Sequence, residues 1–330
     1  MTLRGEDRLI DWLRRHTPGT RIGDDAAVLP RDSFAVTTDT QIAGVHVPPN
    51  LDPGRVARRL LAVNASDLAA MGAEPAFAFL VIAAPDGFDH RRFLHHFVRA
   101  AQAIGAELAG GDLAHSRHLV VSATLLGRQR AGSRWLRRDG ARPGHRVWLG
   151  GTVGEAHLGL GVLAQGAEVK RRGLRLPPPL AAPRTLAAAA RRAVRRQLLP
   201  LPQLALGRWL ACHSPAGAAI DLSDSLAHDL HRLCRASDTG AEIDARRLPV
   251  PRDAKRLAAT LGIDLEEALW HGGEDYVLCF TLPAECVPPD EFQCIPIGRI
   301  RNQPGIERID SSGTHSPVPD RGFDHLIATV

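Results

Sequence analysis

Residues 64–72 read Asn-Ala-Ser-Asp-Leu-Ala-Ala-Met-Gly, and they form the second half of a helix whose two ends are well marked. Asp52 is a suitable N-cap and Pro53 suits the first helical position. Gly72 and Pro75 end the helix. Apolar side chains and alanines surround almost the whole second half, so we expect this helix to be buried.

Asp67 is the exception in this apolar helix, because an ionised carboxylate is costly to bury unless it is paired or holds a cation. Asn64 lies three residues earlier and therefore shares its helical face. Two interpretations are open from this stretch alone. Asp67 is either a structural aspartate, in a cap or an ion pair, or a ligand of a bound cation.

The composition is that of a soluble globular protein, and its 330 residues with 44% hydrophobic side chains are enough for two domains. The N-terminal residues include acids and no apolar stretch, so we expect no signal peptide. No apolar run approaches the roughly 18 residues of a membrane span. Five cysteines without a CxxC pair argue against a disulfide framework and a structural zinc site. A reducing, cytoplasmic location with no membrane contact fits best.

The formal net charge of +5 raises the possibility of a nucleic-acid partner, since a basic tract includes Lys170, Arg171 and Arg172 and continues through Arg191 to Arg196. Almost every basic residue is arginine, which indicates a general compositional bias of the organism rather than a groove built for nucleic acid. Aromatic side chains are not interleaved with the tract, as a single-strand platform would require. We therefore expect no nucleic-acid partner, whereas small anionic ligands such as phosphates remain compatible with the charge.

Apolar segments with helical and strand periodicity alternate along the first part of the chain. We expect helices over 6–16, 53–71 and 89–104, and strands over 34–39, 76–83 and 119–126. A cluster of glycine and proline at 140–145 predicts a turn between two domains. The first domain is therefore expected to be α/β or α+β.

Three features of the second part carry weaker signals. The glycine loop at 150–154 follows a strand and precedes a helix, but it lacks the lysine of a P-loop and is a weak phosphate signal. The segment 168–202 is rich in arginine and proline, so we expect an irregular or mobile insertion in which alanines 187–190 could form a short helix. His228 and His231 have a spacing compatible with a metal pair, but we favour surface histidines.

Six aspartates share one setting, at or near the end of an apolar element and beside small residues: Asp25, Asp39, Asp67, Asp112, Asp221 and Asp224. Carboxylates, together with the hydroxyls of Thr37 and Ser223, are hard oxygen ligands that suit Mg²⁺. Magnesium in proteins usually also contacts phosphate. The residues therefore predict a Mg²⁺ and polyphosphate site shared by both domains, with six independent structural aspartates as the alternative.

The same positions carry a resemblance to a known family, the thiamine-monophosphate kinases. The matching motifs occur in order over nearly the whole chain: Gly-Asp-Asp-Ala-Ala at 23–27, Thr-Thr-Asp-Thr at 37–40, Gly-Val-His at 44–46, Asn-Ala-Ser-Asp-Leu-Ala-Ala-Met-Gly-Ala-Glu-Pro at 64–75, Gly-Gly-Asp at 110–112, Ile-Asp-Leu-Ser-Asp at 220–224 and Gly-Gly-Glu-Asp-Tyr at 272–276. Each motif alone is weak, whereas the ordered set is specific.

This resemblance implies the two-domain fold of proteins related to aminoimidazole ribonucleotide synthetase. An N-terminal α/β domain over residues 1–137 would dimerise through its sheet, and a C-terminal α+β domain would occupy residues 138–330. The resemblance also implies a homodimer that uses ATP and several Mg²⁺ ions to phosphorylate thiamine monophosphate to thiamine diphosphate.

Site residues follow from the resemblance position by position. The magnesium positions are Asp25, Thr37, Thr38, Asp39, Asp67, Asp112, Asp221 and Asp224. The ATP positions are Gly111, Asp112, Arg138 and Ser223. The thiamine monophosphate positions are His46, Glu274 and Phe323, the last of which offers a ring to the heterocycles of the substrate.

The acceptor in this reaction is a phosphate oxygen that is already ionised at neutral pH, so we expect neither a general base nor a covalent nucleophile. Direct in-line transfer then depends on placement and on neutralisation of charge. Departures from the family pattern are Ser225 in place of a usual glycine, Phe323 where tyrosine or tryptophan also occurs, and the long basic segment 168–202. None of them removes a carboxylate.

Two other interpretations are weighed beside the kinase. One is another ATP-dependent enzyme of the same superfamily, acting on a purine intermediate, selenide or a hydrogenase maturation substrate. The other is a basic binding protein that has kept the scaffold without catalysis. The presence of His46 and Glu274 together with the full set of acids favours the kinase over both.

Overall fold

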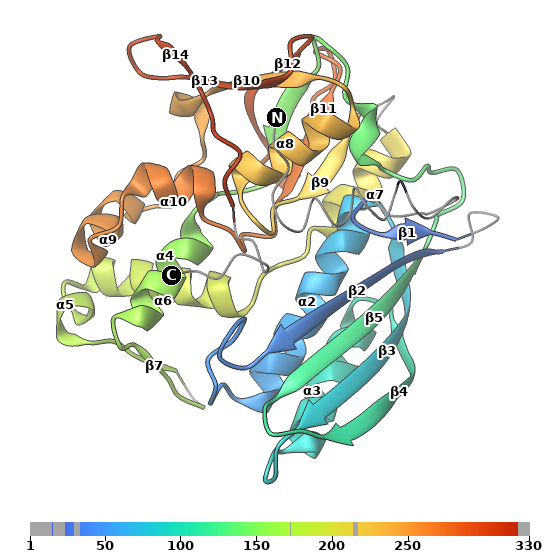
Figure 1. Cartoon of the computed structure of the whole chain (residues 1–330), viewed down its shortest axis with the longest axis vertical. Helices are drawn as coiled ribbons and strands as arrows, with labels where there is room; N and C mark the ends of the chain where they lie inside the picture. The colour runs from blue at the N-terminus through green and yellow to red at the C-terminus, as the bar shows by residue number, and fades with distance from the viewer. Residues whose placement is uncertain (1–14, 16–23, 30–33, 172, 214–216, 323–330) are drawn as a thin grey trace.

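The computed structural model describes residues 15, 24–29, 34–171, 173–213 and 217–322. Phe323 lies outside the described residues, as does the helix expected over 6–16 except for Arg15. Two large sheets, one two-stranded ribbon and the helices around them make up the described chain (Figure 1). This mixed α/β and α+β architecture confirms the predicted fold class. No helix within the described ranges combines the length and the apolar character needed to cross a membrane.

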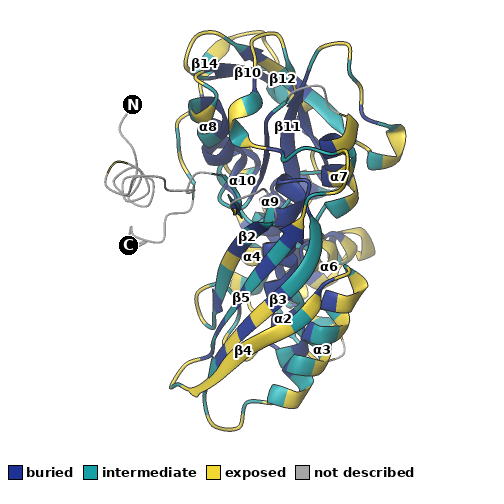
Figure 2. Cartoon of the chain, turned by 90° about the vertical axis from the view of Figure 1, so that its right-hand side faces the viewer, coloured by how far each residue is buried: buried dark blue, intermediate teal, exposed yellow. Residues whose placement is uncertain are grey.

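The first sheet has five strands in the order β1-β2-β5-β3-β4. Its strands are β1 (Ala27–Val28), β2 (Ala35–Ile42), β3 (Glu74–Ala84), β4 (Glu107–His115) and β5 (Val120–Arg128). Only β3 and β4 are parallel, and helix α3 (His90–Ala103) connects them. Helices α2 (Pro53–Ala70) and α3 cover one face of the sheet. The opposite face stays largely open, and Figure 2 shows exposed residues along β4.

Helix α2 has the ends and the burial that the sequence predicts. Asp52 is its N-cap and accepts a hydrogen bond from the Gly54 backbone N–H, with Pro53 at the first helical position. Leu60 and Leu68 are fully buried against the sheet. Burial of each such leucine contributes about 1.5–3 kcal/mol, so the core of the first sheet is built largely around this helix.

The second sheet has seven strands in the order β14-β13-β10-β12-β6-β11-β9. Its strands are β6 (Arg146–Leu149), β9 (Ala219–Asp221), β10 (Gly240–Asp244), β11 (Leu278–Leu282), β12 (Ile295–Arg301), β13 (Gly305–Ile309) and β14 (His315–Pro317). Helix α8 (Leu226–Ala236) covers one face, and helix α7 (Leu204–His213) covers the other. Successive residues of β6 serve the two layers, because side chains alternate along a strand: Val147 packs with α8 and Trp148 with α7.

The remaining elements pack together beside the two sheets. They are α4 (Glu155–Ala164), the short strands β7 (Glu168–Val169) and β8 (Leu174–Arg175), α5 (Pro178–Ala181), α6 (Arg184–Leu198), α9 (Ala254–Leu261) and α10 (Leu265–His271). Helices α4, α6 and α9 contact one another.

The expectation of an irregular insertion over 168–202 is wrong for most of that segment. Helix α6 is 15 residues long and has one apolar face, on which Leu186, Ala190 and Val194 are buried. Its arginines occupy the other face. The composition hid this helix because tertiary packing against α4, rather than local propensity, stabilises an amphipathic helix in a protein.

Helices α2 and α7 approach closely where the two sheets meet. A Cβ atom added at Gly207 of α7 would lie 2.0 Å from the Ala69 carbonyl oxygen of α2. Glycine is therefore required at this crossing by the backbone of the neighbouring helix.

We expect Gly207→Ala to lower the free energy of unfolding by about 1–3 kcal/mol, because the added methyl group forces the two helices apart. Urea unfolding monitored by circular dichroism measures the loss. Arg208→Ala on the adjacent, exposed position is the matched control, with an expected change within about 0.5 kcal/mol. Equal stability of the two variants would contradict the close approach.

Candidate active site

Three carboxylates from distant parts of the chain meet between the two sheets. Asp25 precedes β1, Asp67 lies in α2 and Asp221 ends β9. One ligand oxygen from each lies within 4.8 Å of the others. Asp39 of β2 is the fourth acid of the group, since its charge contributes to raising the pKa of Asp67.

Hydrogen bonds between α2 and β2 fix this arrangement. The Thr37 hydroxyl donates to Asp67 Oδ2 at 2.5 Å, and the Asp39 backbone N–H donates to Asn64 Oδ1 at 3.1 Å. Asn64 in turn donates to the Leu60 carbonyl at 2.8 Å. The shared helical face of Asn64 and Asp67 therefore turns both side chains toward β2.

The clustered negative charge of these carboxylates favours the binding of a cation. Burial, strengthened by repulsion from neighbouring carboxylates, raises the pKa of Asp67 and of Asp221 well above the usual value. Asp221 is only 2% exposed, and its Oδ2 atom has no hydrogen-bond donor among the described residues. Carboxylate and hydroxyl oxygens are the hard ligands that Mg²⁺ prefers, so this group could hold that cation.

A second group of potential metal ligands lacks these properties. Glu242, Glu307 and His315 also have ligand atoms within 4.8 Å of one another. Each glutamate is paired with an arginine, Glu242 with Arg299 at 2.9 Å and Glu307 with Arg301 at 2.6 Å. The two arginines balance the acids, so this group needs no cation.

Two arginines border the carboxylate group. The guanidinium of Arg138, a predicted ATP residue, donates to both oxygens of Asp25 at 2.9 and 3.0 Å. Arg232 donates to Asp224 Oδ2 at 2.5 Å. Asp229, only 1% exposed, accepts the backbone N–H groups of Asp224 and of the next residue. Burial raises the pKa of Asp229 to about 6.

Asp112 and Thr38 lie away from this group, on the open face of the first sheet. Asp112 pairs in register with Val81 and is exposed, and Thr38 donates to the Ala123 carbonyl at 3.0 Å. Strand β4 is three strands from β2, a distance of about 14 Å at the usual strand spacing. Within one chain, therefore, Asp112 does not face Asp67.

The expected position of the acids at the ends of apolar elements is wrong for Asp39 and Asp112. Both lie inside strands, β2 and β4 respectively. The polar residues around them concealed the continuation of each strand. Gly111, a predicted ATP residue beside Asp112, has a structural role as well, because a Cβ atom there would lie 1.9 Å from the Leu80 carbonyl oxygen.

The predicted substrate residues His46 and Glu274 occupy defined positions in the described chain. His46 Nδ1 accepts the Ile42 backbone N–H at 3.0 Å. This bond places the proton of the neutral ring on Nε2. The Glu274 carboxylate accepts hydrogen bonds from Arg59 and from the Gln197 amide. Phe323, the third predicted substrate residue, cannot be placed because it lies outside the described residues.

The glycine loop at 150–154 is capped by the chain itself. Asp275 accepts the backbone N–H groups of Gly154 at 2.5 Å and of Ala156 at 3.0 Å, at the start of α4. Burial raises the pKa of Asp275 to about 6. Its carboxylate takes the N–H groups that a phosphate would use, so the weak phosphate signal of this loop has a structural explanation.

His228 and His231 are not surface histidines, contrary to the sequence-based expectation. They are 3% and 2% exposed, because the C-terminal segment covers α8. His228 Nδ1 lies 2.6 Å from Asp320 Oδ1, and His231 Nε2 lies 3.0 Å from the Val318 carbonyl oxygen. Ser225, the departure from the family pattern, is the N-cap of α8 and accepts the His228 backbone N–H at 3.0 Å.

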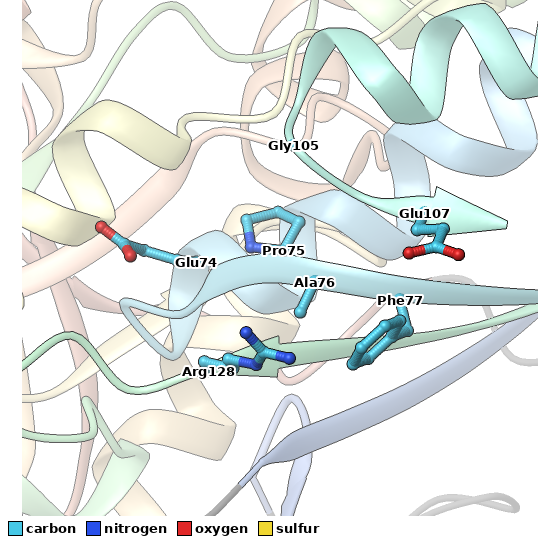
Figure 3. A pocket seen from close by; sticks show the side chains of 7 residues that line it. All are labelled: Glu74, Pro75, Ala76, Phe77, Gly105, Glu107 and Arg128. Atoms are coloured by element: carbon cyan, nitrogen blue, oxygen red, sulfur yellow. The ribbon is translucent and has the colours of Figure 1, made fainter. Parts of the chain in front are cut away.

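A surface pocket at the edge of the first sheet lies apart from these acids (Figure 3). Its lining consists of Glu74, Pro75, Ala76, Phe77, Gly105, Glu107 and Arg128. The Arg128 guanidinium lies over the rings of Phe34 and Phe77 at 5.5 and 5.1 Å. None of the predicted site residues lines this pocket.

Sequence reasoning missed five residues that hold the site in place: Arg59, Gln197, Asp229, Arg232 and Asp275. One usable signal was Arg59, a charged residue in the same buried helix as Asp67. Another was Asp275, which lies inside the Gly-Gly-Glu-Asp-Tyr motif. Gln197, by contrast, lies far from any motif and is recognised only by its contacts.

The part of the chain that forms the first sheet matches a known protein family. The family described as AIR synthase related protein, N-terminal domain, matches residues 23–129. A thiamine-monophosphate kinase of Salmonella typhimurium is 37% identical over 269 residues, which cover 80% of this chain and 76% of that protein. A thiamine-monophosphate kinase of Synechococcus elongatus is 33% identical over 348 residues, which cover 98% of this chain and 96% of that protein.

Solved structures agree with the sequence comparison. The structure of AaThiL complexed with AMPPCP and TMP matches with a TM-score of 0.82 at 28% identity, covering 99% of this chain and 100% of the other. The likeness therefore extends over both sheets and the helices between them.

The contact between His228 and Asp320 predicts a pH dependence of stability. Burial alone would lower the pKa of His228, but the hydrogen bond with Asp320 raises it above its usual 6.5. The same contact, with one from Arg235, lowers the pKa of Asp320 although burial acts against it. Arg232 and Asp229 also face the histidine. The pair therefore stabilises the fold most between about pH 4 and 6.5.

We expect the stability difference between the wild type and His228→Gln to shrink as the pH rises from about 6.5 to 8.5, because the wild type loses its imidazolium contact there. Urea unfolding at a series of pH values measures this difference. His118→Gln, at an exposed position, controls for the ordinary titration of a histidine. A difference that stays constant over the range would contradict the ionic contact.

Proposed function

Because this chain belongs to the thiamine-monophosphate kinase family, we propose that Asp25, Asp67 and Asp221 bind Mg²⁺ during its reaction. The enzyme uses ATP to phosphorylate thiamine monophosphate, and the product is thiamine diphosphate. One observation carries the magnesium proposal: carboxylates from three separate parts of the chain converge within 4.8 Å, and a buried oxygen of Asp221 has no donor among the described residues. Thr37, Thr38, Asp39, Asp112 and Asp224 remain the further predicted magnesium positions.

The geometry supports direct transfer between two bound phosphates. Bound magnesium supplies positive charge that offsets the repulsion between the anionic donor and acceptor. Thr37 orients Asp67 through its hydrogen bond. Arg138 and Ser223 are both predicted ATP residues. The Arg138 guanidinium borders the carboxylate group, where it can offset the negative charge of a phosphate chain. The acceptor oxygen is already ionised, so the residues place and neutralise the reactants without removing a proton.

His46 and Glu274 are proposed to hold thiamine monophosphate. The hydrogen bond from Ile42 puts the proton of a neutral His46 on Nε2, and an imidazole N–H is a donor of the kind that binds a phosphate oxygen. Glu274 is an acceptor and suits the N–H donors of the ring system of the substrate. Phe323 stays a prediction for the same site.

We propose that the active protein is a homodimer formed through the open face of the first sheet. Phe79 and Val81 are 41% and 43% exposed on this face, and their cross-strand neighbours Thr124 and Ser122 carry small hydroxyl side chains. Exposed apolar faces of this kind mark interaction sites. Closed dimers are the commonest symmetric assemblies.

The dimer also gives Asp112 a place in the site. A two-fold axis parallel to the strands, between two such faces, brings β4 of one copy opposite β1 and β2 of the other. We therefore propose that Asp112 and Gly111 act on the site of the partner copy, where Thr38 faces them. This arrangement accounts for an acid that a single chain places about 14 Å from Asp39.

The two sheets support a division into domains at residues 137 and 138. Strands of the first sheet span residues 27–128, and the second sheet begins with β6 at Arg146.

The five cysteines are all unpaired, which supports the proposed cytoplasmic location, since disulfides persist in oxidising compartments.

We expect Asp67→Asn to reduce the formation of thiamine diphosphate by at least about 100-fold, because loss of residues that merely support metal ligands already costs 10–100-fold. Product analysis by chromatography after incubation with ATP, Mg²⁺ and thiamine monophosphate measures the loss. Asp86→Asn, at a fully exposed carboxylate, should keep wild-type activity. Circular dichroism of both variants should match the wild type.

Metal binding is measured separately from activity. Mg²⁺ without nucleotide should raise the unfolding temperature of the wild type and have a much smaller effect on Asp67→Asn, because a ligand that binds the folded state stabilises it. An equal rise in both proteins would contradict the assignment of Asp67 as a ligand. Failure of the folded wild type to form any thiamine diphosphate would reject the proposed function.

Mixing two inactive variants tests the shared site. Asp67→Asn and Asp112→Asn should each be inactive, whereas exchange of subunits in a one-to-one mixture should restore roughly a quarter of wild-type activity, since half the dimers then contain one intact site of two. Activity of the mixture after incubation, compared with each variant alone, measures this. No recovery, although labelled subunits are shown to exchange, would mean that Asp112 does not act across the dimer.

A further inference from the structure

Arg59 is a buried cation that joins three parts of the chain. It lies in α2, its side chain is 0% exposed, and its Nε donates to Gln41 Oε1 in β2 at 2.8 Å. Its two other guanidinium nitrogens donate to the Gln197 carbonyl in α6 and to Glu274 Oε1. A buried guanidinium without a partner would be costly, so this arrangement favours one position of Glu274.

Glu274 has both carboxylate oxygens engaged. Oε1 accepts from Arg59, and Oε2 accepts from the Gln197 amide. The side chain nevertheless remains 28% exposed. An ionised carboxylate offers about four lone-pair positions, so the two contacts orient the group and leave acceptor positions on its open side for a ligand.

The backbone around Glu274 is held as firmly as the side chain. Its N–H donates to the Ser223 carbonyl at 2.7 Å, and the Tyr276 N–H donates to the Leu222 carbonyl at 2.8 Å. Asp275 is bonded to the start of α4. Glu274 and Tyr276 have φ values of +67° and +48°, a left-handed conformation that non-glycine residues keep only where their surroundings determine it.

The hydrogen bond with Glu274 explains the buried position of the Gln197 side chain. The side chain is 3% exposed, and its Oε1 atom has no hydrogen-bond donor among the described residues. A buried amide oxygen without a donor costs free energy. The charge-assisted bond from the amide nitrogen to Glu274 offsets that cost.

We propose that Arg59 and Gln197 are positioning residues for Glu274, and that helix α6 thereby completes the thiamine monophosphate site. This inference rests on the proposed function. Arg59 balances the charge of Glu274, so the carboxylate recognises an N–H donor of the substrate by direction rather than by net charge. Through Gln197, the basic segment 168–202 therefore contributes to substrate binding.

Steady-state kinetics of Gln197→Leu test this inference. We expect the KM for thiamine monophosphate to rise about tenfold, equivalent to about 1.4 kcal/mol. The KM for ATP and the kcat at saturation should stay within about twofold, because the contact serves only one substrate. Arg195→Gln, exposed on the same helix, is the matched control and should leave all three parameters unchanged. Arg59→Lys, which keeps the charge but not the three directed bonds, should also raise the KM for thiamine monophosphate.

A double variant separates positioning from a general structural role. If Gln197 acts through Glu274, the KM of Gln197→Leu with Glu274→Gln should equal that of Glu274→Gln alone. An unchanged KM for thiamine monophosphate in Gln197→Leu, an equal rise in the KM for ATP, or additive effects in the double variant would each overturn the inference while leaving the kinase activity established. Absence of turnover by the wild type would instead reject the proposed function, and this inference with it.

Discussion

Burial of helix α2 is the constraint on which the rest of the structure depends. The helix lies against the first sheet on one side and meets α7 and β9 on the other. A polar side chain on the buried face of this helix is costly unless a partner from another element satisfies it. Asn64 finds the backbone of β2, Arg59 finds Glu274, and Asp67 finds other carboxylates. Helix α2 thus fixes the distance between Glu274 and the carboxylate group around Asp67.

Arg59 and Asp67 of α2 have opposite electrostatic surroundings. Arg59 is balanced by a carboxylate within the chain, and the pair gives a neutral, directed contact. Burial, together with neighbouring charges of its own sign, raises the pKa of Asp67. Such a group is unfavourable without a cation. In the site that we propose, this contrast separates two tasks, recognition of the substrate rings and neutralisation of the phosphates.

Loops near the ends of strands of the second sheet are fixed by buried acids that accept hydrogen bonds from backbone N–H groups. Asp229 holds the turn that contains Asp224, and Asp275 holds the turn that contains Glu274. In both turns a buried structural carboxylate lies close to a predicted functional one. The structural acid binds backbone N–H groups, which keeps the functional acid available to a ligand. Rigid support of this kind is what a site needs when catalysis depends on placement.

The sequence by itself determined the helix over 53–70, the fold class and the set of acids, because these follow from local caps, periodicity and an ordered series of motifs. Only the tertiary structure decided which residues meet. It buried His228 and His231 under the C-terminal segment, ordered α6 against α4, and placed Asp112 on the open face of the sheet. Gln197 shows the reason most clearly. It lies 77 positions from Glu274 along the chain, and no local pattern encodes a contact that exists only after two distant segments have packed together.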